Sequence, residues 1–144
     1  MGFLDNLGQK MKSEGVKLLK PYPDQYMEKK DLLERFETVD EKALSESSEA
    51  LFSFIRERCI RGNARRFQIF LDGQEVFKIS MDAQCSISCG PGFHKIYVRL
   101  DSLTSQVLNV KAEAGKRYFF DIACTMNDGM ILRRIEDRQK REEE

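Results

Sequence analysis

The sequence predicts an α+β protein, in which a helical N-terminal region precedes a seven-stranded antiparallel β-sandwich. Two observations lead to this prediction. Apolar residues recur at helical spacing up to Gly62-Asn63 and alternate with polar residues after it. Turn residues then interrupt the chain at roughly ten-residue intervals, which is typical of antiparallel sandwiches. We therefore divide the chain into a helical region (1–62), a sandwich (63–137) and a charged tail (138–144).

An amphipathic helix is predicted over residues 3–20. The apolar side chains that share its predicted face are Leu4, Leu7, Met11 and Leu18, with Phe3 beside them. Gly8 and Gly15 each weaken a helix by about 1 kcal/mol relative to alanine. We therefore expect this helix to lie on a surface, which is the rest of the chain, a partner protein or an anionic membrane.

Two more helices are predicted before the sandwich, over about 24–38 and about 47–60. Asp24 is a suitable N-cap for the first of them. The second has a clear apolar stripe, formed by Ala50, Leu51, Phe54, Ile55 and Cys59. Gly62-Asn63 follows, and this pair is typical of a helix end.

Short strands are predicted one after another from Phe67 to Ile135. In most of them apolar and polar residues alternate, so that every second side chain faces the core, as do His94, Ile96, Val98 and Leu100. The turns predicted between strands are Asp72-Gly73, Gly90-Pro91-Gly92, Ala114-Gly115 and Asn127-Asp128-Gly129. Because these turns are short, the strands are expected to pair as antiparallel neighbours.

Three stretches in this region have a familiar form: FLDGQEV at 70–76, CGPGFHKIYV at 89–98 and AGKRYFF at 114–120. Together they resemble PEGA-type domains and a related bacterial domain of unknown function that is often found in lipoproteins. The resemblance covers about residues 68–135. It implies a β-sandwich and supplies no catalytic residues. Members are usually exported, whereas this chain shows no lipobox cysteine near its start, so we expect a bacterial cytoplasmic protein.

Charge and cysteine content bear on partners and compartment. The chain has 24 Lys and Arg and 24 Asp and Glu, so its formal net charge is zero, which argues against nucleic acid as a partner. We interpret the basic stretch from Arg56 to Arg66 as a solvated helix end. No long apolar run or secretory signal is present, so the expected location is the cytoplasm, with association with a membrane surface as an alternative. The four cysteines are therefore expected to be free thiols.

Cys85, Cys89 and His94 are the candidate metal ligands. The Cα atoms of residues four apart on a strand are separated by about 13 Å, too far for one zinc ion unless the chain bends. Buried free cysteines commonly serve as small core residues, and His94 suits a strand start that bonds the adjacent turn. The sequence therefore predicts no catalytic residue, no cofactor and no metal, with a metal-binding protein as one alternative.

These observations predict a non-enzymatic interaction or scaffold protein, whose partner is another protein or a second copy. The residues expected to make contacts lie on the first helix and on the sheet: Phe3, Leu4, Leu7, Met11, Leu18, Phe70, Tyr97 and Phe119. The second alternative is a peripheral membrane protein that docks through the helix over residues 3–20.

Overall fold

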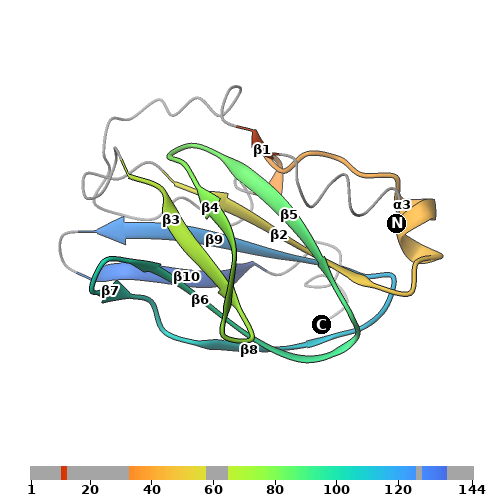
Figure 1. Cartoon of the computed structure of the whole chain (residues 1–144). Helices are drawn as coiled ribbons and strands as arrows, with labels where there is room; N and C mark the ends of the chain where they lie inside the picture. The colour runs from red at the N-terminus through yellow and green to blue at the C-terminus, as the bar shows by residue number, and fades with distance from the viewer. Residues whose placement is uncertain (1–10, 13–32, 58–64, 126–127, 136–144) are drawn as a thin grey trace.

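The computed structural model describes residues 11–12, 33–57, 65–125 and 128–135, and these form two β-sheets that pack face to face (Figure 1). Sheet A consists, in spatial order, of β1 (Met11–Lys12), β5 (Gln84–Cys89), β2 (Ala50–Arg56), β9 (Arg117–Thr125) and β10 (Gly129–Ile135). Sheet B consists of β4 (Gln74–Ile79), β3 (Phe67–Leu71), β6 (Gly92–Leu100) and β7 (Leu103–Thr104), and β8 (Leu108–Ala112) also pairs with β6. The fold is a β-sandwich, and each strand predicted after residue 63 has a counterpart in it.

The helix predicted over about 47–60 is wrong, because residues 50–56 form β2 in the middle of sheet A. All seven residues of β2 are buried. Phe52 and Phe54 face the core between the sheets, while Leu51 and Ile55 face the opposite side of sheet A. A strand that is buried on both faces is a continuous apolar run, and periodicity does not distinguish such a run from a buried helix. The sandwich therefore does not begin at residue 63.

The sandwich is also not wholly antiparallel. β2 pairs antiparallel with β5 but parallel with β9, with Phe52 opposite Tyr118 and Phe54 opposite Phe120. A parallel pair needs a long crossover between its strands, and here sheet B lies in sequence between β2 and β9.

The predicted helical N-terminal region is not supported. Met11 and Lys12 form β1 and pair with Cys85 and Gln84 of β5, and the remainder of residues 3–20 lies outside the described residues. Most of the helix predicted over 24–38 also lies outside them. The helix with defined bounds in the described region is α3 (Glu41–Ser45), which Asp40 caps by accepting a hydrogen bond from the Ala43 amide at 3.1 Å.

The core lies between the two sheets. Phe52, Phe54 and Phe120 of sheet A form its aromatic centre, with the Phe120 ring centroid 5.3 Å from that of Phe52 and 5.1 Å from that of Phe54. Ile69 of β3 and Ile96 of β6 pack on them from sheet B. Each of these side chains is almost completely buried, which stabilises the fold by about 1.5–3 kcal/mol per residue.

The side of sheet A that faces away from the core is covered. Residues 33–46, which we call the strap, pack on this side, with Phe36 against Ile55 and Ile135. The Gln84 side chain holds the strap, because its Oε1 accepts from the Glu37 amide and its Nε2 donates to the Arg35 carbonyl, both at 2.8 Å. This leaves the outer face of sheet B as the uncovered side of the described sandwich.

Candidate functional site

The outer face of sheet B is built on β6, whose side chains alternate strictly. Ile96 and Val98 are buried in the core, whereas Lys95 and Arg99 are exposed on the outer face. Gln68 of β3 lies between two cations on this face, because it is the register partner of both Lys78 in β4 and Arg99 in β6. Cross-strand partners share a face of a sheet, so β4, β3 and β6 together carry one polar row.

A pair of aromatic rings lies next to this row. Phe70 and Tyr97 are register partners, and their rings are stacked with centroids 4.8 Å apart and an angle of 5° between the planes. The guanidinium of Arg99 lies 5.4 Å from the centroid of the Phe70 ring. Both aromatic residues were predicted to point outward, and the structure brings them together as one half-buried pair.

Five cationic side chains are exposed on or beside this face: Arg66, Lys78, Lys95, Arg99 and Lys111. Lys78 lies 3.9 Å from Glu75, a weak surface ion pair. Within the described part of the chain, no carboxylate forms an ion pair with the other four. We call these five residues the cationic set.

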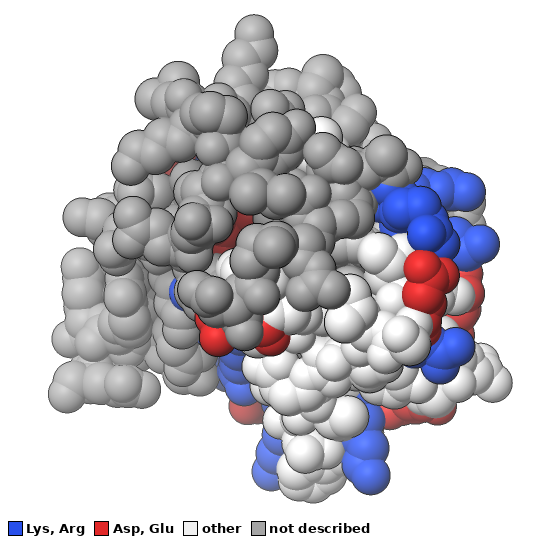
Figure 2. All heavy atoms as spheres, turned by 90° about the vertical axis from the view of Figure 1, so that its left-hand side faces the viewer, with Lys and Arg blue, Asp and Glu red and all other residues white. Residues whose placement is uncertain are grey.

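A shallow hollow of about 330 Å³ lies at the end of sheet B, and its lining consists of Arg65, Arg66, Gln68, Lys78, Leu100 and Asp101. Figure 2 shows this end of the molecule, where Lys and Arg side chains gather on the right of the view beside acidic ones. Arg65 forms a two-bonded ion pair with Asp101, at 2.9 and 3.1 Å, and this hydrogen bonding lowers the pKa of Asp101. The negative charge of Asp101 is thus balanced by Arg65. Among the described residues, no carboxylate balances the positive charge of Arg66 in the same hollow.

His94 is held by hydrogen bonds on both sides of its ring. Its Nδ1 lies 2.7 Å from Asp72 Oδ2, and its Nε2 lies 2.6 Å from the Gly90 carbonyl oxygen. Both partners are acceptors, so two N–H donors are required and the geometry is that of the protonated imidazolium. Burial lowers the pKa of His94, but the bonds to Asp72 and Gly90 outweigh it and the pKa is raised above 6.5. With both nitrogens engaged, the arrangement is that of a structural clamp.

The other two candidate metal ligands are buried thiols. Burial raises the pKa of Cys89 to about 12, helped by the negative charges of Asp72 and Glu49, and raises that of Cys85 further. Both thiols are therefore protonated at neutral pH and are poor nucleophiles and poor ligands. Among the described residues, no three His, Cys, Asp or Glu side chains are grouped to hold a metal ion.

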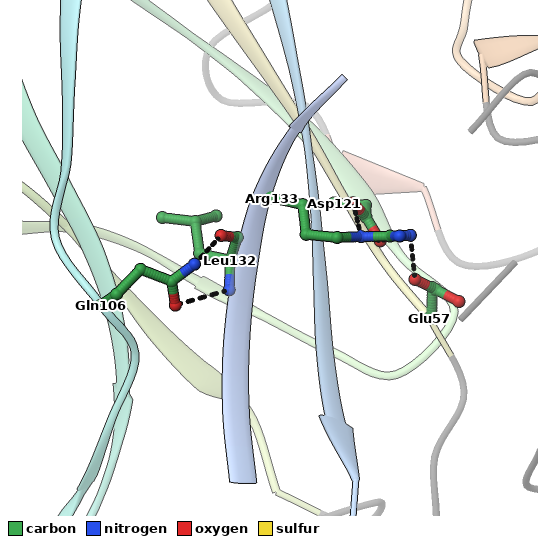
Figure 3. Close-up of polar contacts among 5 residues, drawn as sticks. All are labelled: Glu57, Gln106, Asp121, Leu132 and Arg133. Atoms are coloured by element: carbon green, nitrogen blue, oxygen red, sulfur yellow. Dashed lines mark hydrogen bonds and ion pairs between the residues drawn. The ribbon is translucent and has the colours of Figure 1, made fainter. Parts of the chain in front are cut away.

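A layer of polar groups on the outer side of sheet A was not predicted from the sequence. Arg133 of β10 bonds Asp121 of β9 through Nε and Nη2, at 3.0 and 2.9 Å, and its Nη2 lies 3.4 Å from Glu57 (Figure 3). Nearby, Arg117 donates to the Ser53 hydroxyl at 2.8 Å, and burial lowers the pKa of Arg117 to about 10. The guanidinium stays charged at neutral pH, so this layer is an internal ion-pair and hydrogen-bond network.

The second contact in Figure 3 links the two sheets. Gln106, in the connection between β7 and β8, donates from its side-chain amide to the Leu132 carbonyl of β10 at 2.6 Å. Its Oε1 lies 3.5 Å from the Leu132 amide nitrogen. The side chain thus takes the place of a neighbouring strand along β10.

The remaining predicted contact residues lie elsewhere. Phe119 is on sheet A, where the Phe36 ring of the strap packs on it with centroids 4.9 Å apart, so it does not join Phe70 and Tyr97. Met11 is in β1. Phe3, Leu4, Leu7 and Leu18 lie outside the described residues, as does the proposed membrane-docking helix. No helix in the described part of the chain has the length and hydropathy of a membrane span.

Comparisons with known proteins give distant likenesses. No family model matches this sequence, and no curated protein matches it. One similar structure is the N-terminal domain of AlgF from P. aeruginosa, with a TM-score of 0.41 and 10% identity over 62% of this chain and 96% of that one. Another is a Bacteroides ovatus protein whose suggested role is cell adhesion, with a TM-score of 0.40 and 14% identity over 62% of this chain and 44% of that one. Neither is described as a PEGA-type domain, so that resemblance stays a prediction.

Proposed function

We propose that this protein is a non-enzymatic interaction module that binds a partner protein through the outer face of sheet B. The observation that carries the proposal is the contrast between the two outer faces. On sheet A, Leu51, Ser53 and Ile55 point away from the core and are nevertheless completely buried. On sheet B, the equivalent side chains are exposed or half-buried, and a half-buried stacked aromatic pair lies among exposed cations. Aromatic and arginine side chains are the types that most often dominate protein interfaces.

The backbone supports this use of the face. β3, β6 and β8 pair through continuous registers, and the inward side chains of β6 are locked in the core. The backbone positions of the outward residues are therefore fixed before a partner arrives, which lowers the backbone entropy lost on binding. The proposed compartment is the cytoplasm of a bacterium, and the buried thiols of Cys85 and Cys89 fit its reducing conditions.

A pair of matched variants tests the proposal. Asn109 is exposed on this face opposite Lys95, and Ser48 is exposed in the turn between α3 and β2. Asn109→Trp adds a bulky side chain to the binding face, and Ser48→Trp adds the same bulk elsewhere. In affinity capture from cells followed by mass spectrometry, partners kept by the wild type and by Ser48→Trp are expected to be lost with Asn109→Trp. Capture of the same proteins by all three forms would contradict the proposal.

A further inference from the structure

We propose, building on the function proposed above, that the partner presents an acidic segment that lies along β6 and is bound by the cationic set. Most of the described carboxylates near this face are committed elsewhere: Asp101 to Arg65, and Asp72 to His94 and to the Lys95 amide. Glu75 lies on the face itself, where it accepts a hydrogen bond from Gln68 and forms the weak ion pair with Lys78. The charges of Arg66, Lys95, Arg99 and Lys111 are left to a partner.

The positions of these cations fit an extended chain. Lys95 and Arg99 are on the same side of β6, four residues apart, which places their Cα atoms about 13 Å from each other. Lys78 and Lys111 flank them on β4 and β8, on either side of the strand. A segment in β conformation presents alternate side chains with the same period, so acidic residues at every second or fourth position meet the cations in register.

Arg99 is suited to bind a carboxylate. Its guanidinium lies 5.4 Å from the centroid of the Phe70 ring, within the range of a cation–π contact, and its N–H donors are available for a two-bonded carboxylate. The contact with the ring also restrains the side chain, so less rotamer freedom is lost on binding. Phe70 and Tyr97 thus act as a support for Arg99.

The same stacking disfavours nucleic acid. Single-stranded nucleic acid binds to sheets by stacking bases on open aromatic faces. Here Tyr97 already stacks on Phe70 and Arg99 lies over the same ring, so the pair is a packed unit. A carboxylate-bearing segment needs the cations and no free ring.

The test uses the full chain and a labelled peptide of alternating Glu and Gly of about nine residues, the length of β6. Binding is measured by fluorescence anisotropy at low and high salt. The variant Lys78→Glu/Arg99→Glu reverses two charges on the face. The variant Lys42→Glu/Lys116→Glu makes the same change of net charge at exposed positions around α3 and the turn before β9.

We expect salt-sensitive binding of the Glu peptide, weakened about tenfold or more by Lys78→Glu/Arg99→Glu and less than about twofold by the matched control. Equal losses in the two variants, or equal binding of a peptide with Gln in place of Glu, would overturn the proposal. So would tighter binding of a single-stranded oligonucleotide or of anionic vesicles, or self-association in sedimentation that disappears with the same charge reversal. If the peptide fails to bind while Asn109→Trp still loses captured partners, the acidic partner is wrong and the proposed function stands.

Discussion

Arg56 shows what a single buried cation does in this fold. It lies at the end of β2 and is completely buried, with its guanidinium 3.5 Å from the centre of the Phe67 ring. Its Nη1 donates to the Arg65 carbonyl at 2.6 Å and to the Ile79 carbonyl at 3.0 Å. These carbonyls lie where β3 begins and β4 ends, so one side chain ties sheet A to sheet B. The sequence interpretation placed Arg56 in a solvated basic stretch, because neighbouring arginines gave no sign that one of them turns inward.

Two glycines with positive φ differ in their surroundings and give a residue-scale prediction. Gly115 has φ +81°, and a Cβ there would lie 2.8 Å from the Ser45 carbonyl oxygen of α3. Gly73 has φ +87° in the β3–β4 turn, and a Cβ there would meet nothing within 4 Å. Gly73→Ala is expected to destabilise the protein by about 1–2 kcal/mol from backbone strain alone. Gly115→Ala is expected to cost about 1–3 kcal/mol more, because α3 must also move.

Urea unfolding of the two variants measures this difference. Equal losses in the two variants would show that α3 does not pack closely on the turn between β8 and β9. The turns at Asp72-Gly73 and Ala114-Gly115 were predicted from the sequence, because glycine adopts positive φ easily and therefore marks a turn locally. The approach of α3 to Gly115 could not be predicted, since it depends on contacts between distant parts of the chain.

At the scale of elements, local pattern identified the strands of the second half and failed for β2. Alternation marks β3, β6 and β8 because turn residues bound them and half of their side chains meet a single core. β2 is buried on both faces, so its nearly continuous apolar run, ALFSFI, fits a buried helix equally well. Its parallel pairing with β9 joins residues more than sixty positions apart, as Leu51 with Arg117, and no local signal encodes such a pair.

The candidate site, too, could be predicted from the sequence only in part. The outward direction of Phe70 and Tyr97 could be predicted, because each lies between inward apolar neighbours. The polar row of Lys78, Gln68 and Arg99 could not be predicted, because it depends on the register between β3 and β6. These two strands are not joined by a hairpin. The pairing of β3 with β6 therefore decides which cations become neighbours.

The His94 clamp gives a prediction about two connecting elements. It joins the β3–β4 turn, through Asp72, to the β5–β6 connection, through the Gly90 carbonyl. The pKa of His94 is raised in the folded state above its unfolded value near 6.5. Its contribution to stability is therefore fully present below pH 6.5 and is lost as the pH rises through the folded pKa. The stability difference between the wild type and His94→Asn is expected to shrink over that interval.

NMR titration of the single imidazole measures the folded pKa directly. Asp72→Asn removes the negative charge and one strong acceptor, so the pKa of His94 is expected to fall in that variant. The carboxylate of Asp72 stays charged throughout this interval, because hydrogen bonds from the Lys95 amide and from His94 lower its pKa. An imidazole pKa below 6.5 in the wild type, or one unchanged by Asp72→Asn, would rule out the clamp.

At the scale of the whole molecule, composition hides the distribution of charge. The net charge is zero, and this balance argued against a polyanionic partner when it was averaged over the chain. In the structure, Asp121 and Glu57 are buried and paired with Arg133 on sheet A, and Glu37 and Glu41 lie near Arg117. The uncovered face of sheet B keeps its cations exposed. A chain that is neutral overall thus exposes a group of cations on one sheet face.

The proposed function requires that the outer face of sheet B contacts the partner. Photo-cross-linking tests it with a benzophenone-bearing amino acid placed at Asn109 on this face or at Ser48, which is exposed in the turn between α3 and β2. Illumination in cells is expected to give discrete cross-linked products from position 109 and none of the same products from position 48. Products that form equally from both positions, or from position 48 alone, would contradict the account.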